Sequence, residues 1–205
     1  MNEHYFSPTS STDDARRPLR VTLAGAEREL VSSRAVFSGG GLDKATRVLL
    51  DRLDVLTPVP AGARIVDLGC GWGPIALSAA LLHPDAEVWA VDVSERAREL
   101  TTENARRLGV DDLRVIAPED WPADQRVDVL WSNPPIRIGK EALHSLLLTW
   151  TARLRPTGTA ALVVGRNLGA DPLRAWLEDQ LPGRRVTKAA SAKGFRVLEV
   201  SALTD

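Results

Sequence analysis

A glycine-rich turn between an apolar segment and a helical pattern is the first place in the chain suited to binding a ligand. It reads D-L-G-C-G-W-G over residues 67–73 and brings together Asp67, Gly69, Gly71 and Gly73. Glycines permit a tight turn and let a ligand approach the main chain at the carboxyl end of a strand. The G-x-G-x-G spacing differs from the dinucleotide fingerprint G-x-G-x-x-G. It favours a nucleoside with a charged amino-acid end over a pyrophosphate, and a glycine turn without a ligand is the alternative.

Acidic residues follow at the ends of the next two predicted strands. Asp92 lies 25 residues beyond Asp67, where a carboxylate accepts hydrogen bonds from both ribose hydroxyls. NAD-binding proteins use the same placement, and a helix-start acid favoured by the macrodipole is the alternative interpretation. After the third strand, Asp120 is a candidate acceptor for an adenine amino group and Trp121 a candidate contact for the ring, although exposed loop acids are common.

An N-P-P sequence ends the fourth predicted strand and is the strongest candidate for chemistry. Pro134 and Pro135 stiffen the loop and remove two N–H donors. The Asn133 side-chain oxygen and the Pro134 carbonyl remain as outward acceptors, able to hold the two hydrogens of a planar exocyclic amine. The nitrogen lone pair is then aimed at an electrophile. A strand-end turn without function is the alternative.

The elements that must position these residues alternate between strands and helices. Segments 64–68, 87–92, 113–117, 127–132, 159–164, 184–189 and 195–201 predict strands. Segments 74–82, 94–108, 140–154 and 171–180 predict helices, with a further helix from Asp43; Pro156 and Gly158 are expected to close the helix 140–154. The alternation predicts an α/β fold with a Rossmann-like, doubly wound, seven-stranded, mostly parallel sheet whose last strand is antiparallel. Segments 19–23 and 29–33 predict an N-terminal β-hairpin extension.

Together, D-x-G-x-G-x-G, the strand-end acid and N-P-P resemble a class I S-adenosylmethionine-dependent methyltransferase that acts on an amino group. Phe37-Ser38, followed by G-L-D-K at residues 41–44, is similar to a motif of the "methyltransferase small domain" family. That family includes the small-subunit ribosomal RNA guanine-N2 methyltransferases (RsmC-like). Residues 4–7, 133–144 and 193–198 resemble its single-domain archaeal and Gram-positive branch.

The resemblance implies a cofactor, a site and a reaction. The cofactor is S-adenosylmethionine, and its expected contacts are Phe37, Asp43, Asp67, Gly69, Gly71, Gly73, Asp92, Asp120, Trp121 and Asn133. The expected catalytic residues are Asn133, Pro134 and Pro135. Residues 37–205 are expected to form the methyltransferase domain, and residues 1–36 an N-terminal arm and hairpin extension. The implied reaction is methylation of an exocyclic amino group, foremost guanine N2 in small-subunit ribosomal RNA.

Other functions remain open. N-P-P loops also serve adenine-N6 and protein-glutamine methyltransferases, and a non-catalytic RNA-binding relic is a further alternative. NAD-dependent oxidoreduction is disfavoured, because the dinucleotide fingerprint is broken and no acid/base pair stands out.

Departures from the family pattern concern the substrate side. Ala45 replaces a glycine, and Ile136 replaces an aromatic residue that would stack on a flipped base. Ile136 offers only an apolar wall, so Phe37, Phe195 or a residue on the cofactor side is expected to supply the stack. The expected substrate-binding residues are Ile136, Arg137, Lys140, Lys193, Phe195 and Arg196. The same basic stretch contains Arg184, Arg185 and Lys188, and it either holds phosphates or protects a strand edge.

Composition sets the remaining expectations. The chain has 205 residues, 44% of them hydrophobic, and a net charge of -1, which excludes a strongly basic nucleic-acid module. Residues 131–205 carry 11 Lys and Arg against 6 Asp and Glu, so this third of the chain suits a polyanion such as ribosomal RNA, unless the bias is ordinary scatter. One cysteine and no apolar run of about 18 residues predict a cytoplasmic protein without a membrane span. No metal-ligand spacing is present, and a monomer is expected.

Overall fold

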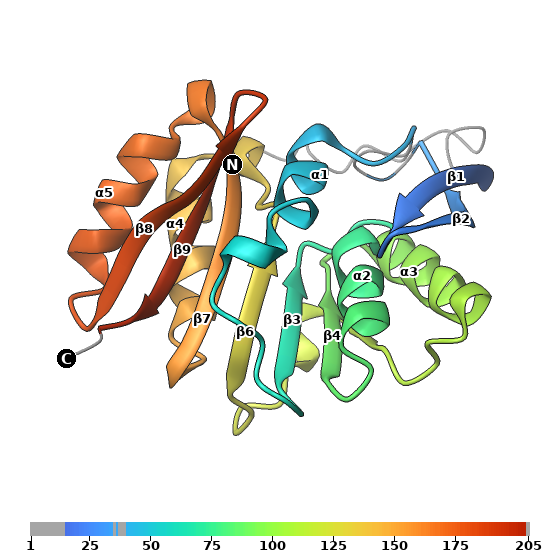
Figure 1. Ribbon diagram of the computed structural model, residues 1–205, viewed down its shortest axis with the longest axis horizontal. Coiled ribbons are helices and arrows are strands. Elements are labelled where there is room, and N and C mark those ends of the chain that lie inside the picture. Colours follow the sequence, from blue (N-terminus) through green and yellow to red (C-terminus); the bar gives the residue numbers. More distant parts are fainter. Residues whose placement is uncertain (1–14, 35, 37–39, 204–205) are drawn as a thin grey trace.

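A seven-stranded sheet with helices on both faces forms the body of the protein (Figure 1). In this computed structural model, the described residues are 15–34, 36 and 40–203. The strands of the sheet are β3 (Arg64–Leu68), β4 (Glu87–Val91), β5 (Arg114–Ile116), β6 (Val127–Ser132), β7 (Leu154–Gly165), β8 (Arg184–Ala192) and β9 (Phe195–Ala202). Their spatial order is β5-β4-β3-β6-β7-β9-β8. The predicted Rossmann-like fold class is therefore confirmed.

Strand direction brings the polar loops to one edge of the sheet. Strands β3 to β7 pair in parallel, whereas β9 runs antiparallel to both β7 and β8. The carboxyl ends of β3, β4, β6 and β7 and the turn between β8 and β9 consequently share the edge that is uppermost in Figure 1. Ligands of open α/β sheets bind outside this edge, where the strand order reverses between β3 and β6.

The two faces of the sheet are covered by different helices. The helices α1 (Lys44–Leu50), α2 (Pro74–Leu82) and α3 (Glu95–Leu108) pack on one face. The helices α4 (Lys140–Thr151) and α5 (Ala170–Gln180) pack on the other through Leu147, Trp150 and Leu177. Because both faces are buried, the central strands are continuously apolar, as in the I-V-D-L run of β3, where Asp67 is the one exception.

The boundary between α4 and β7 differs from the prediction. The helix ends at Thr151, and β7 already begins at Leu154, so Pro156 and Gly158 lie inside the strand segment rather than in a closing turn. Residues 155–158 form an irregularity, because the pairing register jumps from Val127↔Leu154 to Val129↔Thr159. A Cβ at Gly158 would lie 2.8 Å from the Val127 carbonyl oxygen, so this close approach requires glycine.

The predicted N-terminal hairpin is confirmed and consists of β1 (Arg17–Leu23) and β2 (Ala26–Ser32). Ala24 (φ 48°) and Gly25 (φ 78°) supply the two left-handed residues of its turn. Its apolar face, with Leu23 and Leu30, shares one hydrophobic cluster with α2 and α3. Burial of each such leucine stabilises the hairpin by about 1.5–3 kcal/mol.

Candidate cofactor and substrate site

The glycine turn is held to the end of β4 by its own backbone. The N–H groups of Gly69 and Cys70 both donate to the carbonyl oxygen of Val91, at 2.8 and 3.1 Å. Gly69, Gly71 and Gly73 all have positive φ, which side-chain-bearing residues rarely adopt. At Gly73 space is also limiting, because a Cβ would lie 3.0 Å from the Thr101 side chain. Burial raises the pKa of the Cys70 thiol well above its usual value, so this cysteine fills space as a protonated thiol.

Asp67 is a buried carboxyl group beneath this turn. Its Oδ2 accepts from the Ala76 N–H at 2.9 Å, whereas its Oδ1 is buried and has no partner among the described residues. Burial raises the pKa of Asp67 to about 8; the nearby Asp92 adds to the rise, and the hydrogen bond from Ala76 opposes it. An unpartnered buried carboxylate oxygen calls for a cationic or hydrogen-bonding ligand group.

Asp92 continues the site at the end of β4. Its Oδ2 accepts from the Gly71 N–H at 3.0 Å and its Oδ1 from the Ser94 N–H at 2.9 Å, which fixes the carboxylate between the glycine turn and the start of α3. Burial raises its pKa, against the effect of these two hydrogen bonds and of Arg98. The next residue, Val93, is 72% exposed, so an apolar side chain stands beside the carboxylate with nothing packed over most of it.

The N-P-P loop begins at Asn133, whose side-chain amide is anchored from α1. Asn133 Nδ2 donates to Asp43 Oδ2 at 2.9 Å and to Thr46 Oγ1 at 3.0 Å. The same Asp43 oxygen caps α1 by accepting from the N–H groups of Ala45 and Thr46. Because an ionised carboxylate only accepts hydrogen bonds, the donor end of the Asn133 amide must face Asp43. Its Oδ1 is thereby left as the accepting end of the amide.

The second expected acceptor, the Pro134 carbonyl, is already used once. It accepts from the Ile136 N–H at 2.8 Å, which closes a tight turn and leaves one lone pair for a further donor. The start of the loop is fixed to the cofactor side, because Ser132 Oγ donates to the Leu68 carbonyl at 2.7 Å. The two loops are thus joined at their bases.

The remaining predicted site residues lie in different surroundings. Asp120 is exposed after β5, whereas Trp121 is buried in the core between Trp89 and Trp150, with ring centroids 5.0 and 5.2 Å away. Phe37 lies outside the described residues. On the substrate side, Ile136 and Phe195 are half-buried against the core, and Arg137, Lys140 and Lys193 are exposed at the same edge. Arg196 forms an ion pair with Asp171.

The basic stretch 184–196 does not act as one unit. Arg184 and Arg185 pair with Ala202 and Ser201, at the opposite end of β8 from Lys193. Arg184 donates to the carbonyls of Gly158 and Arg155, which secures the irregular start of β7. Of the two alternatives left open for this stretch, phosphate binding beside the pocket does not apply to Arg184 and Arg185, since strand direction carries them to the far edge.

Several residues at the site were not expected from the sequence. Thr46 belongs to the Asn133 anchor, and its only sequence signal is its position three residues after the capping residue Asp43. Lys44 and Arg166 are exposed at the functional edge, at the start of α1 and after β7. Val93 had a usable signal, because it follows the predicted strand-end carboxylate directly.

Comparison with known proteins shows the family to which the chain belongs. The methyltransferase small domain model matches residues 27–199. The chain belongs to this family. The methyltransferase is 29% identical over 202 residues to the uncharacterized protein YbxB of Bacillus subtilis, covering 97% of this chain and 98% of that protein. It is 32% identical over 182 residues to ribosomal RNA small subunit methyltransferase C of Alcanivorax borkumensis, covering 86% of this chain and 53% of that protein.

The matched ribosomal RNA methyltransferases are longer proteins. Ribosomal RNA large subunit methyltransferase G of Pseudomonas syringae pv. tomato is 38% identical over 162 residues, which cover 74% of this chain and 42% of that one. The solved T. thermophilus 16S rRNA N2 methyltransferase RsmC, in complex with AdoMet and guanosine, superposes with a TM-score of 0.77 at 26% identity. It covers 92% of this chain and 51% of its own. The chain thus spans about half the length of these relatives. Family and fold confirm an S-adenosylmethionine-dependent methyltransferase.

The residues of the glycine turn fit that cofactor. A Cβ at Gly69 would meet no atom within 4 Å, so the main chain there borders open space. The unpartnered Asp67 Oδ1 suits the ammonium of the amino-acid end, Asp92 suits the ribose hydroxyls, and the exposed Val93 suits the face of the adenine. Within residues 15–34, 36 and 40–203, no group of acidic, histidine or cysteine side chains is arranged to hold a metal ion, and no helix is long and apolar enough to cross a membrane.

Proposed function

We propose that the protein methylates an exocyclic amino group of ribosomal RNA, with guanine N2 as the target. The observation that carries the proposal is the anchored amide of Asn133. Asp43 and Thr46 occupy its donor end, so its Oδ1 is committed to accepting, beside a Pro134 carbonyl that retains one lone pair. Two acceptors at the start of one rigid loop match the two hydrogens of an –NH2 group, whereas a hydroxyl or thiol has one.

The chain's part in the reaction is to position the amine. S-adenosylmethionine, when bound, supplies a methyl group on a sulfonium as the electrophile. Asn133 and Pro134 hold both N–H bonds and thereby direct the nitrogen lone pair, and orientation of this kind accounts for much of the acceleration of a two-substrate reaction. No strong base is required at the attack, because the nitrogen becomes acidic once it is methylated and then releases its proton.

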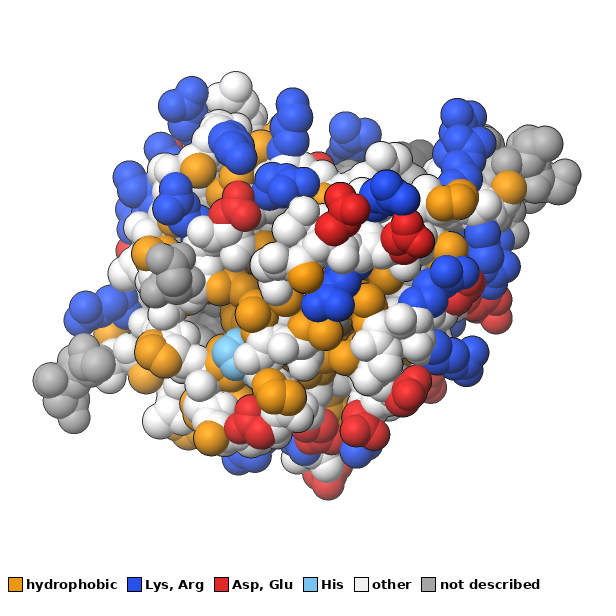
Figure 2. Space-filling model, turned by 45° about the vertical axis from the view of Figure 1, so that its right-hand side comes forward, with side chains coloured by type: hydrophobic (Ala, Val, Ile, Leu, Met, Phe, Trp, Pro, Cys, Tyr) orange, Lys and Arg blue, Asp and Glu red, His pale blue; other side chains and the backbone are white. Residues whose placement is uncertain are grey.

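Unpaired positive charge at the functional edge favours RNA over a protein amide. Five cationic side chains are exposed at this edge. They lie at the first residues of α1 and α4, just after β6 and β7, and in the β8–β9 turn: Lys44, Lys140, Arg137, Arg166 and Lys193. Within the described part of the chain none of them forms an ion pair. By contrast, Arg16, Arg64, Arg107 and Arg114 are paired with glutamates. Figure 2 shows Lys and Arg side chains standing along the upper rim, the edge at which the strands end. Unpaired cations around a site are suited to phosphates.

The decisive experiment is nucleoside analysis of ribosomal RNA from a strain that lacks the gene. We expect the small subunit to lose one N2-methylguanosine and to regain it when the gene is restored. Loss of N6-methyladenosine, or of a methylated glutamine in a protein with an unchanged RNA profile, would replace the proposal with the corresponding alternative. An unchanged profile of all three, together with absence of cofactor binding, would support a non-catalytic module.

Replacement of Thr46 by Val tests the anchor of Asn133. The change keeps the shape of the side chain and removes the acceptor 3.0 Å from Asn133 Nδ2, so the amide is held by Asp43 alone. We expect kcat to fall by roughly fivefold, the effect of one lost hydrogen bond of about 1 kcal/mol. Cofactor affinity should stay within about twofold, measured by calorimetry. Thr102→Val, which removes a hydroxyl bonded to the Arg98 carbonyl in α3, is the control. Equal turnover in both variants would contradict the anchoring role.

The cation pattern makes a prediction about salt. Arg137→Ala and Lys193→Ala should each weaken RNA binding and lower the slope of log affinity against log salt by about 0.7–0.9. Arg185→Ala removes a charge that is also exposed but lies at the far edge, and it should leave the slope unchanged. Titrations at several salt concentrations measure this. The surface is excluded as the RNA site if Arg185→Ala has the same effect as the other two.

A further inference from the structure

Asn104, on α3, is a fully buried polar side chain that no step above uses. Its Oδ1 accepts from the Val31 N–H at 2.8 Å, and its Nδ2 donates to the Val31 carbonyl at 2.9 Å. The same Nδ2 donates to the Trp72 carbonyl at 2.9 Å. One amide therefore joins three segments that are far apart in sequence: β2, α3 and the glycine turn.

The contact with β2 resembles the pairing of neighbouring strands. Val31 pairs with Pro18 in the hairpin at a position where the backbone N–H and C=O groups of both strands point away from each other. Both backbone groups of Val31 turn instead toward α3, where the Asn104 amide satisfies donor and acceptor together. The position of the hairpin is thus fixed by hydrogen bonds as well as by apolar packing.

The contact with the glycine turn is reinforced one helical turn earlier. Thr101 Oγ1 donates to the Gly71 carbonyl at 3.1 Å, and Asn104 holds the carbonyl of the next residue, Trp72. The orientation of two successive peptide units is therefore set by α3. These two peptide units lie between Gly71, whose N–H donates to Asp92, and Gly73, the residue before α2.

We propose that Asn104 is a positioning residue for cofactor binding, which couples the N-terminal hairpin to the glycine turn. Loss of its hydrogen bonds frees the Trp72 peptide and the end of β2 together, so the turn no longer keeps the conformation that binds the cofactor. The proposal rests on the S-adenosylmethionine dependence alone and is independent of the RNA substrate.

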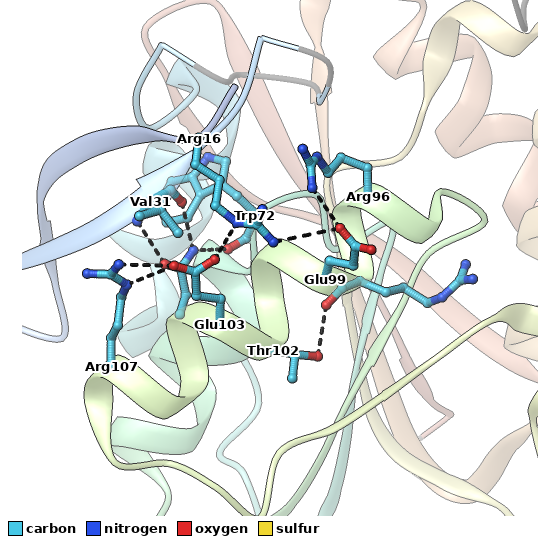
Figure 3. Close-up of polar contacts among 10 residues, drawn as sticks. Arg16, Val31, Trp72, Arg96, Glu99, Thr102, Glu103 and Arg107 are labelled. Carbon is cyan, nitrogen blue, oxygen red and sulfur yellow. Dashed lines mark hydrogen bonds and ion pairs between the residues drawn. The ribbon is translucent and has the colours of Figure 1, made fainter. Parts of the chain in front are cut away.

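The ion pairs at the rim of the same interface provide a comparison. Arg16 binds Glu103 at 2.6 Å and so also connects the start of the hairpin to α3, whereas Arg107 binds the other oxygen of Glu103 at 3.0 Å within α3 (Figure 3). They are solvent-exposed, and exposed ion pairs contribute little. Arg16→Ala therefore loosens the interface without touching the glycine turn.

The test measures cofactor binding in Asn104→Ser and Asn104→Ala. We expect the Kd for S-adenosylmethionine to rise at least about tenfold, because a buried carbonyl loses its donor, with kcat at saturating cofactor within about twofold. Arg16→Ala should leave the Kd within about twofold. Leu177→Ala, in the core of α5, should lower the melting temperature without changing the Kd, which separates a binding effect from a loss of stability. A Kd in either Asn104 variant equal to that of the parent would overturn the proposal.

A second measurement uses the unaltered protein, so it does not depend on the variants folding. Coupling between two sites is reciprocal, so saturating S-adenosylmethionine should slow hydrogen exchange of the Val31 amide. The added protection should exceed that of the β9 amides by at least about tenfold, a larger difference than the general stabilisation by a ligand would give. Equal protection of Val31 and β9 would refute the coupling. Either failure leaves the proposed RNA substrate untouched.

Discussion

Asn133→Ala should abolish most methyl transfer while leaving the cofactor bound. The variant loses the acceptor that Asp43 and Thr46 orient, so the amine is no longer held with its lone pair toward the methyl group. Removal of one preorganised hydrogen-bonding group from an active site costs about 10²–10³ in kcat, and we expect a loss of that size. The affinity for S-adenosylmethionine should change by no more than about threefold, because the glycine turn and Asp92 are intact.

The control for this variant is Asn167→Ala, which removes an exposed asparagine after β7, at the same edge of the sheet. It should retain near-parent turnover. Single-turnover rates with cofactor in excess separate chemistry from binding. Near-normal turnover of Asn133→Ala would refute the two-acceptor arrangement, and a loss confined to cofactor affinity would move Asn133 to the cofactor side of the site.

Asp67→Asn should change stability and cofactor binding in opposite directions. The pKa of Asp67 is about 8 in the fold because of burial, against an ordinary value of 3.8, so between these values the folded protein binds the proton that the unfolded chain has released. The stabilisation is fully present below pH 3.8 and is lost as the pH rises to about 8. By linkage the loss amounts to at most about 6 kcal/mol. Asparagine does not ionise and can still accept from Ala76 N–H, so the variant should lack this decline.

The expected result is a melting temperature several degrees above that of the parent at pH 8, and a smaller difference at pH 5. At the same time the affinity for S-adenosylmethionine should fall by at least about tenfold, because the amide oxygen stays on Ala76 N–H and an NH2 group, which cannot accept, replaces the free oxygen suited to the ammonium. Asp128→Asn is the control: Asp128 accepts from Arg64 N–H at the opposite edge of the sheet, so this change should leave cofactor affinity unaltered. A parent-like pH profile in Asp67→Asn would show that Asp67 titrates in its ordinary range.

The parts of the site that follow from local backbone chemistry could be predicted from the sequence. Positive φ values at Gly69, Gly71 and Gly73 need glycine, and the two prolines after Asn133 define a stiff loop, so both features are visible in a few adjacent letters. The alternation of strands and helices then brings both loops to one edge. The fold class was predictable for the same reason.

The contacts that orient these loops were not predictable, since they join residues far apart in sequence. Asp43 and Asn133 are 90 positions apart, and Asn104 and Val31 are 73 apart. The residues around Asn104 in the sequence do not distinguish a buried asparagine that connects three segments from a surface asparagine, because the helix is rich in charged residues. The role of Arg184 stayed open for a related reason: its charge is visible in the sequence, but not the backbone carbonyls of Gly158 and Arg155 to which it donates.

The pairing of β3 with β6 fixes the distance between the starts of the two loops. Leu68 and Ser132 lie opposite each other at the ends of these strands, and the Ser132 hydroxyl ties them together. The glycine turn, proposed to hold the methyl donor, and the N-P-P loop, proposed to hold the target amine, therefore start one strand spacing apart, about 4.8 Å. Backbone hydrogen bonds maintain that spacing, and no side-chain substitution lengthens it. A relative that acts on a different target is therefore expected to differ in the residues that surround the base. The spacing between the starts of the two loops stays the same.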